Sequence, residues 1–481
     1  MIQANAVPDR AASLVVHPTP GIGDATTIAE ALAHIVAMGS GGGSLLLREG
    51  TYPISATIAL PAGLPIKIFG CGSSTIINLG SNAIPAFTVP TGAVENTPIV
   101  FGNFKVVGDE TAGQAFLEYA DNNGLAEIYM ENIVTTGVET TINSNSTSSA
   151  SSTPGHDDPR FHLLRCRIRP CATNNSVILH NSSFGLPRAW LTEVEFIGDS
   201  LFAIPGGRTA PLFGRLADDT WFGDCYLDSC EMSIGTDESD FATFECFNST
   251  LWNNDNVNLT VTYFLFGSFE GLNPGVIRDS AFRGIYFEAE EAGSNFFSNW
   301  LQDCPIQLFG AGCVIGDNQL IEVRSPWPVA FPFGIKVQNE QCIIRNNRFR
   351  FTQTTPNPTI DIQVSTRILG NDFSECHPPA LGTIQLNSGE NIITDNMFTF
   401  APTTGPNLNE TGGGGGSYYD NNNRLFPNKT GGGPIVDPIL PHGNGSTIQG
   451  TTGVAGNASG GGTATNSIIV WYRNPYGLAM V

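Results

Sequence analysis

The residues best suited to chemistry in this sequence are acids, and they gather in two short stretches. The first stretch runs from Asp218 to Glu245 and the second from Glu288 to Glu291. Two carboxyl groups held at a fixed separation can serve as a general acid and a general base, or as an acid and a nucleophile. We therefore select five candidate catalytic residues from both stretches: Asp218, Asp219, Glu245, Glu288 and Glu290. The alternative is that each of these acids only hydrates an outer surface.

Other reactive side chains form no recognisable site. The 10 cysteines include no CxxC pair, and none of the 7 histidines is spaced to complete a metal site or a triad with Ser or Cys. We therefore predict no metal and no cofactor, and expect most cysteines to be buried free thiols rather than disulfides or metal ligands.

Elements that could position the acids follow from a loose repeat over much of residues 95–400. Short apolar strands end in a polar or small residue, commonly Asn, Asp or Ser, and a large apolar residue follows two positions later. Successive repeats are roughly 20 to 30 residues apart and show no helical pattern, which is typical of a β-solenoid. The strands that we recognise end at Phe184, Phe196, Leu227, Leu251, Phe282, Leu301, Leu320, Phe349, Phe373 and Phe398.

The acids inside this repeat need a separate interpretation. Asn and Asp tolerate the left-handed turn conformation and bond neighbouring backbone groups, so they suit the corner of a coil. The acids three residues before a strand end are therefore assigned to turn structure: Asp224, Asp279, Asp317 and Asp395. The uneven repeat length predicts loops of different length inserted at one corner.

Three regions follow from these patterns. Residues 1–23 form an N-terminal arm and residues 24–400 a parallel β-helix. Residues 401–481 form a glycine-rich linker and a C-terminal β tail, which we expect to be a trimerisation or tip region. A cap helix is predicted at 24–40, where apolar residues keep helical spacing, and a polar excursion near 140–160. The fold class is therefore all-β, a right-handed parallel β-helix.

Composition restricts the partners. The 22 basic and 44 acidic residues give a formal net charge of −22, which would repel a phosphate backbone, so nucleic acid is an unfavourable partner. The sequence has neither an apolar run of about 18 residues nor the features of a signal peptide, so we expect no membrane insertion and no export by the usual route.

The entry to the repeat resembles the pectate-lyase-like β-helix superfamily. Thr27, Ile28, Ala31 and Leu32 match its cap helix, residues 48–52 its R-x-G-T-Y strand end, and Gly70, Gly72, Thr75 and Ile77 its G-x-G-x-x-T-x-I motif. Within this superfamily, the short cap, the irregular repeats and the glycine-rich tail look most like bacteriophage tailspikes and related virion proteins.

The resemblance implies partners and a location. A tailspike is expected to be a homotrimer that binds host surface glycan, is assembled in the host cytoplasm, and acts outside the cell as part of the virion tail. One departure is that only about 20 residues precede the cap, where tailspikes usually carry a particle-binding domain. Attachment to the tail would then use this short arm or an adaptor protein.

The resemblance also bears on the reaction. The polygalacturonase motifs NTD and RIK are missing, as is the pectate lyase pattern of Asp-His and calcium-binding carboxylates. A tailspike glycosidase needs two carboxyl groups roughly 5 to 9.5 Å apart, which acids one or two coils apart could supply. Two alternatives stay open, a non-enzymatic structural or adhesin-like β-helix protein and a bacterial polysaccharide lyase or hydrolase. Five tryptophans could stack on sugars or form core and trimer contacts: Trp190, Trp221, Trp252, Trp300 and Trp327.

Overall fold

The fold was analysed in a computed structural model. The structure describes residues 12–39, 41–89, 97–119, 126–144, 160–170, 176–180, 188–197, 219–223, 226–228, 243–252, 263–266, 275–283, 286–289, 292–321, 333–351, 358–376, 383–399, 408–410, 418–419, 424–426, 472–474 and 477–479. The chain divides into two compact units, Met1–Gly271 (unit 1) and Leu272–Val481 (unit 2), which are described separately.

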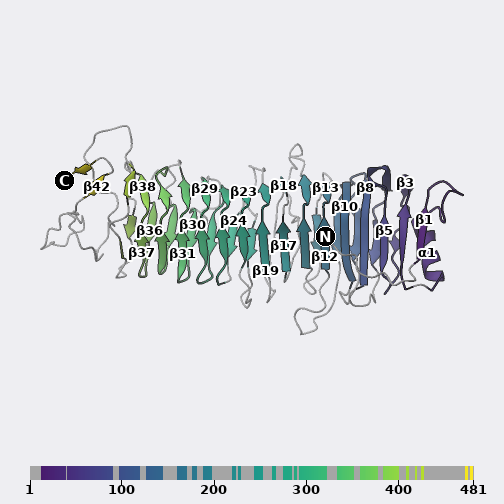
Figure 1. The fold of residues 1–481 in the computed structure, drawn as a ribbon, viewed down its shortest axis with the longest axis horizontal. Coiled ribbons are helices and arrows are strands. Elements are labelled where there is room, and N and C mark those ends of the chain that lie inside the picture. Colours follow the sequence, from purple (N-terminus) through teal and green to yellow (C-terminus); the bar gives the residue numbers. More distant parts are fainter. Residues whose placement is uncertain are drawn as a thin grey trace. The chain divides into compact units, whose positions relative to one another are not determined.

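Unit 1 is a stack of parallel coils whose strands form three faces (Figure 1). The first face contains β1 (Ala12–Val16), β2 (Gly43–Leu47), β5 (Ile66–Phe69), β8 (Thr97–Gly108), β10 (Ala126–Val138), β12 (Arg160–Leu164), β15 (Arg188–Thr192), β17 (Asp219–Gly223) and β19 (Thr243–Phe247). The second contains β3 (Gly50–Pro53), β6 (Thr75–Gly80), the far ends of β8 and β10, β13 (Arg167–Pro170), β16 (Glu195–Ile197), β18 (Tyr226–Asp228) and β20 (Thr250–Trp252). The third contains β4 (Ile58–Ala59), β7 (Pro85–Val89), β9 (Ala115–Tyr119), β11 (Thr140–Ser144) and β14 (Ser176–His180). β21 (Tyr263–Phe266) also falls in this unit.

Unit 2 repeats the same plan. Its first face contains β22 (Val276–Arg278), β25 (Asn295–Phe297), β28 (Val314–Gly316), β31 (Cys342–Arg345), β34 (Thr366–Leu369), β37 (Ile392–Thr394) and β40 (Tyr418–Tyr419). Its second contains β23 (Ala281–Arg283), β26 (Trp300–Gln302), β29 (Gln319–Ile321), β32 (Arg348–Arg350), β35 (Asp372–Phe373), β38 (Met397–Thr399) and β41 (Arg424–Phe426). Its third contains β24 (Tyr286–Ala289), β27 (Ile306–Leu308), β30 (Ile335–Val337), β33 (Ile360–Ile362), β36 (Ile384–Leu386) and β39 (Leu408–Glu410). An antiparallel hairpin joins β42 (Tyr472–Asn474) and β43 (Gly477–Ala479).

The strand pairings confirm the predicted all-β, right-handed parallel β-helix. Alternate residues of each strand point into the coil, so apolar side chains of successive coils meet in a continuous core. In unit 2, Phe349, Phe373 and Phe398 occupy one inward position, with ring centroids 4.6 and 5.2 Å apart. Each coil therefore covers the apolar face of its neighbour.

The corner between the first and second faces has the predicted left-handed residue. Asp279, Asp317 and Asp395 have φ angles of 52°, 57° and 59°, which confirms their assignment to turn structure. Asp224 lies outside the described residues. In unit 1 the same corner holds Asn132 and other left-handed residues: Asn103, Arg165, Glu193 and Asn248.

A buried asparagine follows this corner in most described coils of unit 2. The five members are Asn299, Asn318, Asn347, Asn371 and Asn396. Asn347 shows the pattern: its Oδ1 accepts from the backbone N–H and the Nδ2 of Asn318, and its own Nδ2 donates to the Ile315 carbonyl. The asparagines thus form a continuous ladder, which explains why Asn recurs two residues before the strand end.

The residues that carry the superfamily resemblance have structural roles at the start of unit 1. The buried Tyr52 hydroxyl donates to the carbonyls of Val16 and Arg48, and Thr75 Oγ1 bonds the Leu47 and Arg48 carbonyls. At Gly70 a Cβ would lie 2.5 Å from the Asn103 carbonyl oxygen, so a side chain does not fit. The motif therefore fixes the packing of the first coils.

The cap helix is α1 (Ile28–Ala37), inside the predicted range. Thr27 Oγ1 accepts from the Glu30 backbone N–H, while the Glu30 carboxylate accepts from the Thr26 N–H, so the two ends of the first turn are capped reciprocally. Its buried side, which includes Ile28 and Ile35, contacts β1, β2 and β4.

Two predicted boundaries shift. β1 pairs in register with β2, so the solenoid begins at Ala12, within the residues assigned to an N-terminal arm. β40 and β41 pair with β37 and β38, so the coils of unit 2 continue to Phe426, beyond the predicted end at residue 400. These two strands contain only two or three residues each, which was too short to recognise as a repeat in the sequence. The predicted excursion keeps a strand, β11, up to Ser144, and residues 145–159 lie outside the described residues.

Coil length varies as predicted, but at more than one corner: in unit 1, between the third and first faces, residues 120–125 separate β9 from β10 and residues 145–159 separate β11 from β12. In unit 2, residues 303–305 separate β26 from β27, whereas residues 322–334 separate β29 from β30. The register remains unbroken in both coils. Six cysteines of the described part are buried free thiols and Cys71 is an exposed one, in line with the expectation of buried thiols.

Candidate functional site

Three aromatic side chains form a row on the outer side of the first face of unit 1. Tyr129 on β10, His162 on β12 and Trp190 on β15 are in register across three neighbouring strands. Their strand neighbours point inward and are buried, whereas these three are half-buried. We call them the aromatic row.

The rings of the aromatic row stack face to face. The Tyr129 and His162 centroids are 4.4 Å apart, the His162 and Trp190 centroids are 4.5 Å apart, and both interplanar angles are 7°. Parallel strands are spaced by about 4.8 Å, so equivalent side chains of successive coils meet at stacking distance. The stack covers both faces of the imidazole. A ligand would therefore meet ring edges and their polar atoms rather than open ring faces.

A charged pair lies beside the aromatic row, two residues earlier on the same strands. Arg160 Nη1 lies 2.9 Å from Glu127 Oε1, and the Tyr129 hydroxyl donates to Glu127 Oε2 at 2.6 Å. Burial raises the pKa of Glu127, but the Tyr129 hydrogen bond and the Arg160 charge outweigh it, so the net pKa is lowered. The carboxylate is therefore ionised and held in a fixed orientation.

His162 is a neutral member of this cluster. Burial lowers its pKa to about 4, with Glu127 raising it and Arg160 lowering it by smaller amounts. At neutral pH the ring therefore has one N–H donor and one nitrogen acceptor. Together, the five residues Glu127, Tyr129, Arg160, His162 and Trp190 present an anion, a cation and neutral hydrogen-bonding groups on three coils.

The register extends the row toward two of the predicted catalytic positions. Trp190 pairs with Trp221 on β17, and Trp221 pairs with Glu245 on β19. Asp219 pairs with Thr243, which stands two residues before Glu245. Residues two apart on a strand point to the same side of the sheet, so positions 219 and 245 lie on neighbouring strands and face the same side. Strand geometry puts their Cα atoms about 8 Å apart. The side chains of these residues lie outside the described part.

The other predicted catalytic residues are not brought to this surface by any described contact. Glu288 lies on β24 in unit 2, in register with Gln307 on β27, and its side chain is not described. Asp218 and Glu290 lie outside the described residues. All five residues keep the status of predictions, and the register links only Asp219 and Glu245 as neighbours.

The aromatic row was missed in the sequence, although a signal was available. Tyr129, His162 and Trp190 each stand three residues before a left-handed corner residue, at Asn132, Arg165 and Glu193 respectively. Trp221 and Glu245 stand at the same distance before Asp224 and Asn248. Aligning the coils on their corners, rather than on the strand ends, would have placed all five positions in one row.

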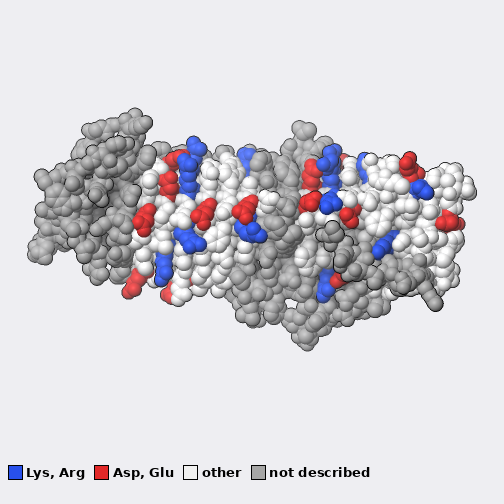
Figure 2. All heavy atoms as spheres, viewed as in Figure 1, with Lys and Arg blue, Asp and Glu red and all other residues white. Residues whose placement is uncertain are grey.

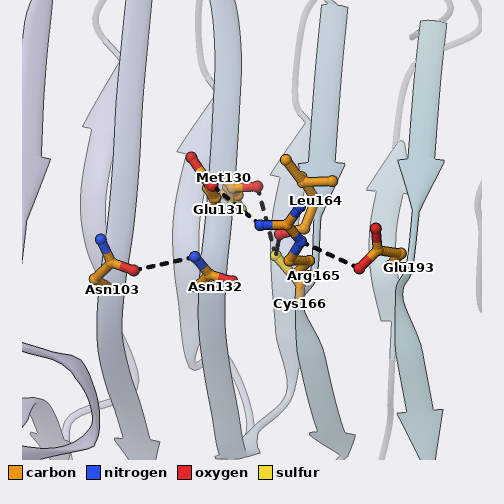
Figure 3. Close-up of polar contacts among 8 residues, drawn as sticks. All are labelled: Asn103, Met130, Glu131, Asn132, Leu164, Arg165, Cys166 and Glu193. Carbon is orange, nitrogen blue, oxygen red and sulfur yellow. Dashed lines mark hydrogen bonds and ion pairs between the residues drawn. The ribbon is translucent and has the colours of Figure 1, made fainter. Parts of the chain in front are cut away.

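The corner beside this row is charged in unit 1. Arg165 Nε lies 3.1 Å from Glu193 Oε2 and its Nη1 lies 3.9 Å from Glu131, while Asn132 Nδ2 donates to Asn103 Oδ1 at 3.1 Å (Figure 3). These side chains bond along the stack from one coil to the next. On the face in Figure 2, acidic and basic side chains of the described residues likewise stand in small mixed groups.

Unit 2 contains a second polar surface, on its third face. Gln307, Lys336, Asp361 and Gln385 are in register on successive coils. The Asp361 carboxylate accepts from Gln363 at 2.9 and 3.0 Å and from Asn387 at 2.6 Å. Burial raises the pKa of Asp361, partly offset by these bonds and by Lys336. The position of Glu288 is three coils away, about 14 Å, too far for the carboxyl pair of a glycosidase.

The tryptophans differ in their surroundings. Trp190 is in the aromatic row, and Trp300 is half-buried on β26. The side chains of Trp221 and Trp252 and the whole of Trp327 lie outside the described part. Among the described residues no group of three or more His, Cys, Asp or Glu could hold a metal ion, and no helix is long and apolar enough to cross a membrane.

The fold and the row define the class of protein: the chain is a parallel β-helix protein with a polar and aromatic outer surface in unit 1. No family model matches the sequence, and no curated protein matches it significantly.

Solved structures of low sequence identity are similar. The A-module of the Azotobacter vinelandii mannuronan C-5 epimerase AlgE6 is 12% identical, with 88% of this chain and 94% of that one covered and a TM-score of 0.32. Tailspike protein 3 of bacteriophage CBA120 is 12% identical, and the match covers 95% of this chain and 64% of the tailspike chain with a TM-score of 0.37. The catalytic domain of a GH87 α-1,3-glucanase in complex with nigerose is 11% identical, and the match covers 85% of this chain and 69% of the glucanase chain with a TM-score of 0.38.

Proposed function

We propose that this protein binds a host cell-surface polysaccharide along the outer side of the first face of unit 1. The observation that carries the proposal is the aromatic row with its charged pair, Glu127 and Arg160, continued in register by the positions of Trp221 and Glu245. A polysaccharide is a linear ligand of repeating, hydroxyl-rich units. A surface that presents hydrogen-bonding groups once per coil, at a constant spacing, suits such a ligand.

The chemistry of the described side chains fits sugar hydroxyls. The Glu127 carboxylate accepts hydrogen bonds, the Arg160 guanidinium donates them, and the neutral His162 ring can do both. The bond from Tyr129 and the contact with Arg160 orient Glu127 before a ligand arrives, which reduces the entropy lost on binding. The half-buried rings contribute apolar edges to the same surface.

Cleavage of the bound glycan is the finer part of the proposal. Positions 219 and 245 have Cα atoms about 8 Å apart, which is compatible with the roughly 6.5 to 9.5 Å carboxyl separation of an inverting glycosidase. We therefore favour Asp219 and Glu245 as the acid and base among the five candidates. The pair lies one and two coils from Trp190, so a glycan lying on the row would reach it.

The tailspike assignment rests on the short cap, the irregular repeats and the glycine-rich tail, within the superfamily that residues 26–77 resemble. Under this assignment the protein is a homotrimer that attaches to the virion tail directly or through an adaptor protein. It is assembled in the host cytoplasm and acts outside the cell. Isolation of the protein from purified virions and a change of host range on exchange of its gene would support this part. Its absence from virions would contradict it.

Binding is tested with the purified full-length protein and a panel of bacterial surface polysaccharides. Trp190→Ala should weaken binding of the recognised glycan at least tenfold, because it removes the end of the described stack. Trp300→Ala, which truncates a half-buried tryptophan of unit 2, is the matched control and should leave the affinity unchanged. Equal affinity of both variants and the wild type, with unchanged circular dichroism, would refute the site.

Cleavage is tested on the same glycan by release of reducing ends or unsaturated sugars. Asp219→Asn and Glu245→Gln should each lower the rate by at least about 100-fold while binding persists, because each removes a proton-transfer group. Asp279→Asn changes a corner acid and serves as control. Binding without any product in the wild type would make the protein an adhesin-like glycan binder.

A further inference from the structure

Two buried cysteines of unit 2 lie on neighbouring coils at one position. Cys313 directly precedes β28, and Cys342 is the first residue of β31. Val314 pairs with Ile343, and the Ile343 backbone N–H donates to the Cys313 carbonyl at 2.9 Å. The two cysteines are therefore in register across adjacent parallel strands.

The sulfur atoms converge on one acceptor. Cys313 Sγ donates to the Gly310 carbonyl at 3.2 Å and Cys342 Sγ lies 3.4 Å from the same oxygen. The two thiols also hydrogen-bond each other, so the pKa of Cys342 is lowered and that of Cys313 is raised. This contrasts with Cys166, whose thiol donates to the carbonyls of Met130 and Leu164 and whose pKa burial raises to about 12.

The backbone geometry suits a covalent link between these residues. Neighbouring strands are about 4.7 to 4.9 Å apart, and the Cα separation in a disulfide is usually about 4.4 to 6.8 Å. Both thiols follow turn residues at the edge of the coil. Gln341 before Cys342 is exposed and Gly312 before Cys313 is half-exposed, so a small displacement of these turns would admit a small oxidant.

The equivalent positions of other coils carry polar side chains. Ser294 precedes β25 where Cys313 precedes β28, and Thr366 pairs with Cys342 on the far side. Both Ser294 and Thr366 are buried, and they occupy the positions of neighbouring coils that correspond to the two cysteines. Serine and threonine are therefore tolerated in this row, which supplies a conservative replacement for either cysteine.

We propose that Cys313 and Cys342 are a disulfide site that joins two adjacent coils when the protein meets an oxidising environment. With a small disulfide such as oxidised glutathione, the Cys342 thiolate attacks one sulfur, the S–S bond of the oxidant breaks, and one glutathione leaves. Cys313 then attacks the Cys342 sulfur of the mixed disulfide and expels the second glutathione. Two protein thiols are oxidised, one oxidant disulfide is reduced, and both thiol protons end on the two glutathiones.

The link would close a loop of chain around one complete coil. Constraining the unfolded chain in this way raises stability, while the strand register requires no change. The proposal does not depend on glycan binding or on a virion location. A chain that is made in a reducing compartment and then leaves it would acquire the link only after folding.

The test uses the reduced, full-length protein, incubated in its native state with oxidised glutathione and then alkylated and digested with trypsin. We expect the peptide 337–345, which contains Cys342, to be linked to the peptide 284–324. Because the second peptide also contains Cys304, the experiment is repeated in Cys304→Ser, where the link should persist. Cys313→Ser and Cys342→Ser should each abolish it.

The thermal midpoint provides a second readout. Oxidation should raise the midpoint of the wild type by several degrees and leave those of Cys313→Ser and Cys342→Ser unchanged. The exposed Cys71 reports whether the oxidant was active, because it should gain a glutathione adduct. The proposal is overturned if Cys71 is modified while the 313–342 link is absent, or if the link forms only in denaturant.

Discussion

At the scale of single residues, the described corners between the first and second faces need a residue that tolerates a left-handed backbone. Asp279, Asp317 and Asp395 adopt φ angles near 55° in unit 2, and Gly370 takes the same corner with φ 64°. An L-residue with a bulky Cβ branch is disfavoured there by about 1–2 kcal/mol, whereas Asn, Asp and Gly are tolerated. The corner acids are therefore explained by backbone conformation without any catalytic role.

Asp317 offers a direct test of this explanation. Asp317→Val should lower the free energy of unfolding by about 1–2 kcal/mol, because a β-branched residue is strained at φ 57°. Asp317→Gly should change it by less than about 0.5 kcal/mol, because glycine adopts this conformation without strain. Urea unfolding of both variants measures the difference. Equal destabilisation would show that the carboxylate, and not the backbone, matters at this corner.

His162 predicts a pH dependence. Its pKa is lowered from 6.5 to about 4, so the unfolded chain takes up a proton first as the pH falls. The contribution of a neutral His162 to stability is therefore complete above pH 6.5 and is lost progressively between pH 6.5 and about 4. The loss should approach about 3 kcal/mol, because each unit of the pKa shift corresponds to about 1.4 kcal/mol. An NMR titration of the ring protons, assigned with His162→Gln, checks this, and a midpoint near 6.5 would contradict the packing of the stack.

At the scale of elements, the asparagine ladder holds the coils of unit 2 in register. Asn318, Asn347 and Asn371 are 1% to 2% exposed, and each bonds the backbone of one neighbouring coil and the side chain of the next. Since buried amides are destabilising unless all their partners are present, the ladder favours one register over any slipped alternative.

Removal of one ladder member should have a large effect. Asn347→Ala leaves the N–H and Nδ2 of Asn318 and the Ile315 carbonyl without their partner, so the free energy of unfolding should fall by about 3 kcal/mol or more. Arg348→Ala, on the same strand and mostly exposed, should cost less than about 1 kcal/mol despite its ion pair with Glu375. Similar losses in the two variants, measured by urea unfolding, would argue against the ladder.

The same elements show what the sequence could and could not predict. The coil repeat, the corner acids and the cap helix were predictable, because each imposes a local pattern of Asn, Asp or apolar spacing. The first strand, β1 at Ala12–Val16, was missed because it is five residues long and is not followed by the corner pattern that marks the later coils. The aromatic row was missed because its members share a position and not a residue type. The proximity of positions 219 and 245 on neighbouring strands needed the register, which spacing alone did not provide.

At the scale of the whole molecule, the two units are built from contacts between neighbouring coils. In such a solenoid, stability is approximately a sum of coil and nearest-neighbour terms, without contacts that reach across many coils. Among the described residues, ion pairs such as Arg165–Glu193 and Arg348–Glu375 are largely exposed and join neighbouring coils. The effect of a substitution should therefore remain near the altered coil.

Hydrogen exchange measured by mass spectrometry can follow this locality. Asn347→Ala should increase exchange in peptides of β28, β31 and β34 in unit 2, which carry or adjoin the altered bonds. Peptides of β8 and β10 in unit 1 should exchange as in the wild type, because no nearest-neighbour term links them to Asn347. A uniform increase in both units would show that the chain unfolds as one cooperative block.

The asparagine ladder has a further consequence for how such a molecule could change in length. Neighbouring ladder residues are separated by 19, 29, 24 and 25 positions, yet in every pair the Nδ2 of one asparagine donates to the Oδ1 of the next. Deletion of residues 318–346, or their tandem duplication, would again bring an asparagine of one coil against an asparagine of the next. The ladder is thus translationally symmetric, and the molecule could be shortened or lengthened in whole coils without redesign of any single joint.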